Sequence, residues 1–187
     1  LAPGLISMQV IQQSFSHSSS SFMIGKIQGN IVDLLYAPLS AAEVTIAVSL
    51  AAVTRSVMIA AISIITFMIL IEIQITNYLT LIAFTFLSSF ILGNVGIIAG
   101  LWSEKFDNMA TVTNFVIVPL SFLSGTFYTI DKLPSFLQTI SEFNPFFYMI
   151  DGFRYSFIGK SDGSITTGLI YLSILSVVTW FITYLLY

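Results

Sequence analysis

Four long apolar segments constrain the fold of this chain more than any other feature of its sequence. They cover roughly residues 44–71, 78–101, 109–127 and 165–187, and few charged residues interrupt them. A helix of about 20 residues is long enough to cross a hydrocarbon core about 30 Å thick. The sequence therefore predicts an all-α membrane protein, built as a polytopic helical bundle.

The composition supports the same class of protein. Of the 187 residues, 56% are hydrophobic and only 8% are charged, whereas ordinary soluble domains are about 25% charged. A soluble fold with this balance would expose large apolar patches. The basic residues form no cluster, so we expect no nucleic-acid partner. The absence of cysteine excludes disulfides, thiolate metal sites and a cysteine nucleophile.

A weaker fifth segment, residues 3–24, is unusually polar for a membrane helix. It contains several glutamines and serines and the only histidine, His17. Such a helix turns its amides and hydroxyls toward other helices or toward water. We therefore expect it inside the bundle or lining a path, with Gln13 and Ser14 as path candidates, and about five transmembrane helices in total. Because the chain begins with Leu1 rather than Met, we also expect upstream sequence.

Residues 25–43 connect the fifth segment to the first long apolar one and predict a short amphipathic helix. Ile27, Ile31, Leu34 and Leu35 recur at the spacing of one helix face. The helix should end at Pro38, and the sequence Ser40-Ala-Ala-Glu43 is a capping box that predicts the start of the next helix. Two interpretations remain open here: a surface helix resting on the bilayer, or a docking element for a soluble partner.

The stretch from Tyr128 to Gly159 is rich in aromatic residues but too interrupted to be a membrane span. Pro134, the pair Asn144-Pro145 and Gly152 break it. The pattern predicts two short helices, about 131–142 and 146–157, with Asp151 and Arg154 close enough on the second to pair. Together they would form a re-entrant helix pair before the last span, at the membrane–water interface.

Three features inside the long segments predict how the helices pack. Arg55 lies about a dozen residues into its span, where a buried cation costs about 2.5–3.5 kcal/mol, so it should either snorkel to a surface or pair within the bundle. Gly96 and Gly100 have the spacing that lets two helix backbones approach closely. Pro119 should kink its helix.

Several kinds of chemistry find no support in the sequence. The tripeptide Gly159-Lys160-Ser161 resembles the end of a phosphate-binding loop, but Arg154 stands where the first glycine is needed, so we expect no nucleotide-binding domain in this chain. One histidine and no cysteine argue against histidine-based metal sites and catalytic triads. We therefore expect a non-enzymatic chain with no cofactor of its own. Counting Lys and Arg on the two sides gives a tie and no orientation.

Several motifs taken together resemble one family. They are Pro119-Leu-Ser-Phe-Leu-Ser-Gly125, Leu133-Pro134, the run from Asn144-Pro145-Phe-Phe-Tyr to Tyr155, and Asn30-Ile-Val-Asp-Leu-Leu-Tyr-Ala-Pro-Leu-Ser40. In order and spacing they resemble the permease subunits of type-2 ABC exporters. The likeness covers essentially the whole chain but lacks the family's N-terminal segment and first span.

The resemblance implies a single permease domain over residues 1–187, with six spans in complete members of the family. It implies a multi-pass protein of the bacterial inner membrane that pairs as a homodimer and binds separate ATPase subunits, which carry ATP and Mg. The cargo would be amphipathic: drugs, lipid-linked molecules or saccharides. Residues 25–43 would be the cytoplasmic coupling helix and 128–160 the outer exit. The residues so implicated are Ile31, Asp33, Leu34, Leu35 and Glu43 for coupling, and Asn144, Pro145, Asp151 and Arg154 for the exit.

Two other classes of function remain as alternatives. The broken hairpin alone would also suit an ion channel or a secondary transporter that uses it as a filter. A membrane-embedded enzyme acting on lipids would need a catalytic cluster, and the sequence offers none. The identity of the cargo cannot be read from the sequence, because apolar cavities carry little specificity signal.

Overall fold

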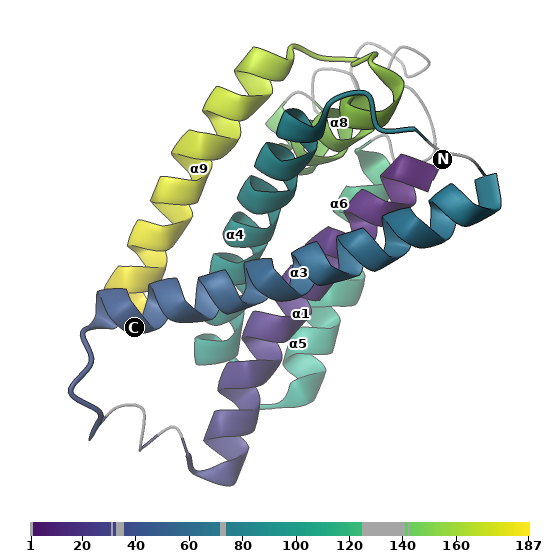
Figure 1. Cartoon of the computed structure of the whole chain (residues 1–187). Coiled ribbons are helices and arrows are strands. Elements are labelled where there is room, and N and C mark those ends of the chain that lie inside the picture. The colour runs from purple at the N-terminus through teal and green to yellow at the C-terminus, as the bar shows by residue number, and fades with distance from the viewer. Residues whose placement is uncertain (1, 31, 33–35, 72–73, 125–140, 142) are drawn as a thin grey trace.

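The structure is a computed structural model that describes the chain except for residues 1, 31, 33–35, 72–73, 125–140 and 142. Its described elements are all helical, and Figure 1 shows them as a bundle with α3 crossing in front of α1 and α4. The elements are α1 (Ala2–Gln28), α3 (Ala41–Ile71), α4 (Tyr78–Trp102), α5 (Phe106–Val112), the π-helical turn η1 (Thr113–Ile117), α6 (Val118–Leu123), α8 (Pro145–Ile158) and α9 (Ile165–Leu186).

The four predicted long spans are confirmed as helices that are long and apolar enough to cross a membrane. They are Ala41–Ile71, Tyr78–Trp102, Phe106–Leu123 and Ile165–Leu186. This confirms the all-α membrane fold. The second helix of the expected re-entrant pair is α8, but most of the first, 131–142, lies outside the described residues. The number of spans in the bilayer and the re-entrant hairpin therefore stay predictions.

Helix α1 lies inside the bundle, as its polarity predicted, and packs most closely on α4. A Cβ atom added at Gly96 would lie 2.6 Å from the carbonyl oxygen of Phe15, and one at Gly100 would lie 2.9 Å from that of Ser19. These distances put the two helix backbones in direct contact. The predicted packing role of the glycine pair is therefore confirmed.

Polar side chains connect the helices near the middle of the bundle. Ser14 Oγ on α1 lies 2.5 Å from Ser56 Oγ on α3, and Ser49 Oγ donates to Asn94 Oδ1 on α4 at 3.1 Å. Thr183 Oγ1 on α9 lies 3.4 Å from the carbonyl oxygen of Asn94. Because lipid gives helices little hydrophobic reason to associate, such hydrogen bonds and close packing hold a membrane bundle together.

The predicted irregularity at Pro119 takes the form of a π-helical turn. Residues Thr113–Ile117 form η1, and the N–H of Val118 donates to the carbonyl oxygen of Thr113, five residues earlier. Pro119 then lies in the first turn of α6. Since proline has no N–H to donate, the regular hydrogen-bond ladder cannot continue through it, and the wider turn absorbs the break.

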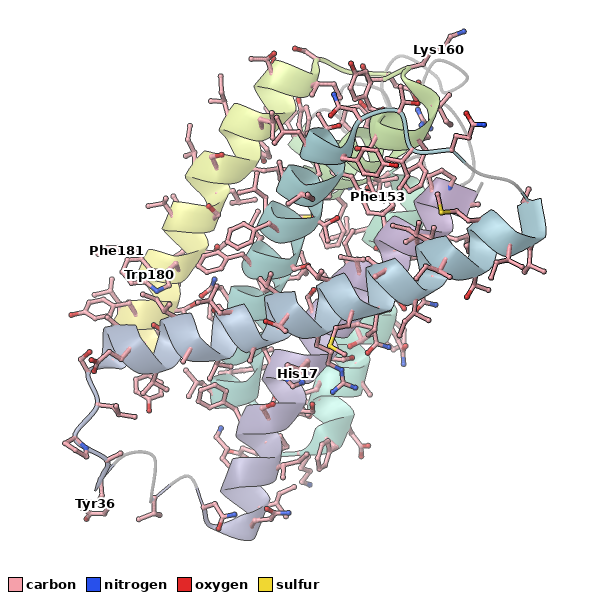
Figure 2. The ribbon with its side chains drawn as sticks, viewed as in Figure 1. His17, Tyr36, Phe153, Lys160, Trp180 and Phe181 are labelled. Atoms are coloured by element: carbon pink, nitrogen blue, oxygen red, sulfur yellow. The ribbon has the colours of Figure 1, made fainter. Side chains whose placement is uncertain are left out.

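The outer face of α9 is apolar and exposed. Ile170, Ile174, Val177, Phe181 and Leu185 are each more than half exposed, and their spacing places them along one side of the helix. Figure 2 shows Phe181 projecting away from the bundle. A continuous apolar face of this kind is suited to lipid.

The two ends of the bundle carry different parts of the predicted site. Figure 2 shows Tyr36 at one end and Lys160 at the opposite end. The connection between α1 and α3 lies at the Tyr36 end, while α8 lies at the Lys160 end (Figure 1). The structure thus separates the described part of the predicted coupling segment from α8, which belongs to the predicted exit region, by the length of the bundle.

Candidate functional site

The connection between α1 and α3 contains the residues that the resemblance implicated in coupling. Ile31, Asp33, Leu34 and Leu35 lie outside the described residues. Glu43 is described and lies in the first turn of α3. The coupling role of all five stays a prediction.

The predicted capping box is confirmed at the start of α3. Glu43 Oε2 accepts hydrogen bonds from the backbone N–H of Ser40 at 2.7 Å and from Ser40 Oγ at 2.8 Å. In return, Ser40 Oγ accepts from the N–H of Glu43 at 3.3 Å. These reciprocal bonds satisfy N–H groups that the first turn of a helix leaves free. They fix where the connecting segment ends and α3 begins.

At the other end of the same segment, Lys26 joins the ends of α1 and α4. Its Nζ donates to the carbonyl oxygens of Leu101 and of Ser103, the latter at 3.1 Å. The last carbonyls of a helix lack partners within the helix and attract a cation. This contact could not be predicted from the sequence, because only the fold brings Lys26 next to residues 101–103. The sequence indicates this contact only by placing a basic residue, Lys26, in the last turn of α1.

Removing the Lys26 contact should lower the stability of the bundle. We expect Lys26→Gln to cost about 1–2 kcal/mol, because hydrogen bonds to charged groups contribute about that much or somewhat more. Thermal unfolding of the purified protein in detergent measures the change. Lys105→Gln, which removes an exposed cation from the nearby start of α5, is the matched control and should unfold as the unchanged protein does. Equal unfolding temperatures for the two variants would contradict the prediction.

The two predicted path residues of α1 differ in their surroundings. Ser14 is fully buried between α1 and α3, where it donates to the carbonyl oxygen of Val10 at 2.7 Å and contacts Ser56. Gln13 is half-buried. Their role in a path stays a prediction, and the structure places Ser14 at a helix contact.

A pocket of about 330 Å³ lies between α1 and the α5–η1 segment. Its walls combine serine hydroxyls with apolar side chains, so it suits a molecule that is itself part polar and part apolar. The serines of α1 are evident in the sequence, but which of them face α5 is determined by the fold. The lining residues are Ser16, Ser19, Ser20, Phe106, Asp107, Met109, Ala110 and Thr113.

Arg55 contacts α1 while its own side chain stays exposed at the surface of the bundle. Its Nη1 lies 3.2 Å from His17 Nδ1, so the contact joins α3 to α1. Figure 2 shows His17 where α3 crosses α1. The only histidine of the chain therefore contacts the one arginine that lies within a predicted span.

At the Lys160 end, Asn144 and Pro145 begin α8. Asn144 Oδ1 accepts from the N–H of Phe146 at 3.0 Å, and Asn144 Nδ2 donates to Ser124 Oγ at 2.8 Å. Pro145 occupies the first helical position, where its missing N–H is not needed. The Asn-Pro pair thus starts the helix, as predicted, and ties it to the end of α6.

Asp151 organises the connection between α8 and α9. It is 4% exposed and accepts hydrogen bonds from the N–H groups of Asp162 at 2.9 Å and Gly163 at 3.0 Å. Arg154 Nη2 lies 3.4 Å from Asp151 Oδ1, which confirms the predicted pair, and Arg154 also pairs with Asp162. Burial raises the pKa of Asp151, while the two N–H donors and Arg154 oppose that rise.

Helix α8 is also joined to the connection between α3 and α4. The N–H groups of Thr76 and Asn77 donate to the carbonyl oxygen of Ser156 at 2.8 and 3.0 Å. Gly152 lies against the ring of Phe84, where an added Cβ would come within 2.2 Å of a ring carbon. These contacts place α8 firmly at one end of the bundle. Among the described residues, no three histidine or carboxylate side chains gather as metal ligands.

Comparison with known proteins gives one consistent result. The family model described as "ABC-2 type transporter" matches residues 1–158. The inner membrane transport permease YadH of Escherichia coli K12 is 32% identical over 167 residues, which cover 89% of this chain and 65% of YadH. YadH of Shigella flexneri gives the same figures. The chain thus spans about two thirds of the length of these relatives, and it belongs to the ABC-2 type transporter family of membrane permeases.

Proposed function

We propose that the chain is the transmembrane permease subunit of an ATP-driven exporter that moves amphipathic substrates across the bacterial inner membrane. The relatives named as inner membrane transport permeases support the location and the transport role. The mixed polar and apolar pocket between α1 and α5–η1 supports an amphipathic cargo. The proposed classes of cargo are drugs, lipid-linked molecules and saccharides.

In this proposal the chain itself hydrolyses nothing. Separate ATPase subunits bind ATP and Mg and dock on the segment between α1 and α3, at the cytoplasmic Tyr36 end. The single observation that carries the proposal is the anchoring of this segment at both ends. Lys26 ties its start to the end of α4, and the Ser40–Glu43 capping box fixes its end to α3. A push on the segment would therefore move α1, α3 and α4 together.

Two permease copies would enclose the path, with α8 narrowing its outer end. The hydrogen bonds of Asp151 and Ser156 hold α8 to its neighbours, which suits a fixed constriction better than a freely moving loop. Helices α1, α3 and α4 would then rearrange beneath it during the ATP cycle.

The coupling role is tested by loss of ATPase docking. Leu34→Asp or Asp33→Ala should reduce co-purification of the ATPase subunits about tenfold, because removing one well-placed contact of an interface costs about 1–2 kcal/mol or more. Membrane insertion should be unchanged. Lys105→Gln, an exposed change at the same end of the bundle, is the control. If the ATPase subunits co-purified equally well with all variants, the coupling assignment would be wrong.

The transport role is tested on the permease and its ATPase partner reconstituted in lipid vesicles. We expect ATP hydrolysis that added substrate stimulates, together with substrate movement that stops when ATP is withheld. Ion conductance or substrate movement that persists without ATP would overturn the proposal in favour of a channel or a secondary transporter.

A further inference from the structure

The contact between Arg55 and His17 lies near the middle of two long helices. Helix α3 has 31 residues, and Arg55 stands about 21 Å from its first residue and about 24 Å from its last at 1.5 Å per residue. His17 occupies a similar place in the 27-residue α1. The buried contact between Ser14 and Ser56, one turn away, sets the two helices at the same level. Arg55 therefore lies near the middle of α3, far from both ends of that helix.

The positive charge of Arg55 has no negative partner in the described part of the chain. Its contact there is with the imidazole ring of His17, which carries no negative charge. The ion pairs found among the described residues are those of Arg154 with Asp151 and Asp162. Arg55 is also exposed on the surface of the bundle rather than enclosed by it. A cation at this depth is costly unless an anion or water reaches it.

A pocket begins beside His17 on α1, although its lining includes neither His17 nor Arg55. His17 directly follows Ser16 and precedes Ser20 by three residues on α1, and both serines line the pocket between α1 and α5–η1. The same pocket has the apolar side chains of Phe106 and Met109 in its wall. The apolar wall suits a hydrocarbon tail, and the guanidinium of Arg55 suits the charged group at its end.

One acidic residue also lines this pocket. Asp107 belongs to the first turn of α5, at the end of that helix next to the α4–α5 connection (Figure 1). It forms no ion pair with Arg55 among the described interactions. Asp107 therefore leaves the charge of Arg55 uncompensated.

We propose that Arg55, held by His17, binds the negatively charged group of an amphipathic substrate, so that the permease selects anionic over cationic amphiphiles. This inference rests on the proposed transport function and adds a substrate class to it. A phosphate or carboxylate would accept hydrogen bonds from the guanidinium, while its hydrocarbon tail lies along the pocket.

Binding of two probes with the same tail tests the proposal without requiring transport. The purified permease with its ATPase partner, in lipid nanodiscs, is titrated with radiolabelled dodecyl phosphate and with dodecyltrimethylammonium, both below their micelle concentrations. We expect the anionic probe to bind at least about tenfold more tightly, because only an anion can accept charge-assisted hydrogen bonds from the guanidinium. Equal affinities for the two probes would overturn the proposal.

Four variants then assign the selectivity to the pair. Arg55→Gln should abolish the preference, Arg55→Lys should keep most of it, and His17→Gln should weaken it. Lys105→Gln, a cation removed outside the pocket, should leave it unchanged. If Arg55→Gln does not fold, Arg55→Lys and His17→Gln decide, because both leave a cation at position 55. A preference that survives Arg55→Gln, or that neither of the other two alters, would refute the site.

The outcome is separable from that of the transport proposal. Charge-selective binding without ATP-driven movement would support the site and reject the exporter. ATP-driven movement with no preference for the anionic probe would do the reverse.

Discussion

Replacing Gly96 by alanine should destabilise the bundle more than replacing either of the other glycines of α4 by alanine. The new Cβ atom would lie 2.6 Å from the carbonyl oxygen of Phe15 and 3.0 Å from Cβ of Ser18. The first of these is backbone, so no side-chain rotation can relieve the clash, and α1 and α4 must separate. Overpacking of this kind costs about 1–3 kcal/mol, occasionally more. Thermal unfolding of the purified protein in detergent measures the loss.

Gly93, one turn earlier on the same helix, provides the matched control. A Cβ atom there would lie 3.2 Å from the Ala52 methyl group and 3.7 Å from the nearest backbone atom, Cα of Ser49. A shift of a few tenths of an ångström relieves that contact, so Gly93→Ala should change stability by less than Gly96→Ala. If the two variants unfolded at the same temperature, direct contact between the α1 and α4 backbones would not be what holds these helices together.

Much of this fold could be predicted because its signals are local. Runs of apolar residues between 44 and 187 located the spans, and the spacing of Gly96 and Gly100 located a close helix contact. The capping box at Ser40 and Glu43 needs only four consecutive residues, and the pair of Asp151 and Arg154 needs only one turn.

The parts that sequence reasoning missed depend on contacts between distant segments. Lys26 meets the end of α4 only because α1 and α4 run parallel, so that their C-terminal ends lie side by side, and no residue near Lys26 in the sequence indicates that partner. The phase of α1 is a similar case. The sequence shows which residues of α1 are serines. Whether Ser14 or Ser16 faces the pocket, however, depends on where α5 lies. The remaining predicted coupling residues before Pro38 lie outside the described part of the chain.

Replacing Asp151 by alanine should release the connection between α8 and α9. The carboxylate accepts the N–H groups of Asp162 and Gly163, and it lies beside Arg154. Without it, both N–H groups lose their acceptor in a site where Asp151 was 4% exposed. A buried donor left unsatisfied costs about 1–3 kcal/mol, so the total loss should be about 3 kcal/mol. The backbone amides of Asp162 and Gly163, which these hydrogen bonds protect, should exchange faster in hydrogen-exchange measurements.

Two further variants separate the acceptor role of Asp151 from its charge. Asp151→Asn keeps one oxygen as an acceptor but turns an amide donor toward the second N–H, so it should lose about half as much stability as alanine. Asp107→Asn, which neutralises an exposed carboxylate in the first turn of α5, should cost less than about 1 kcal/mol. If Asp151→Ala left amide exchange at 162 and 163 unchanged, the Asp151 hydrogen bonds would not be what holds α8 to the start of α9. The fixed constriction that we propose α8 forms at the outer end of the path would then lose its main structural support.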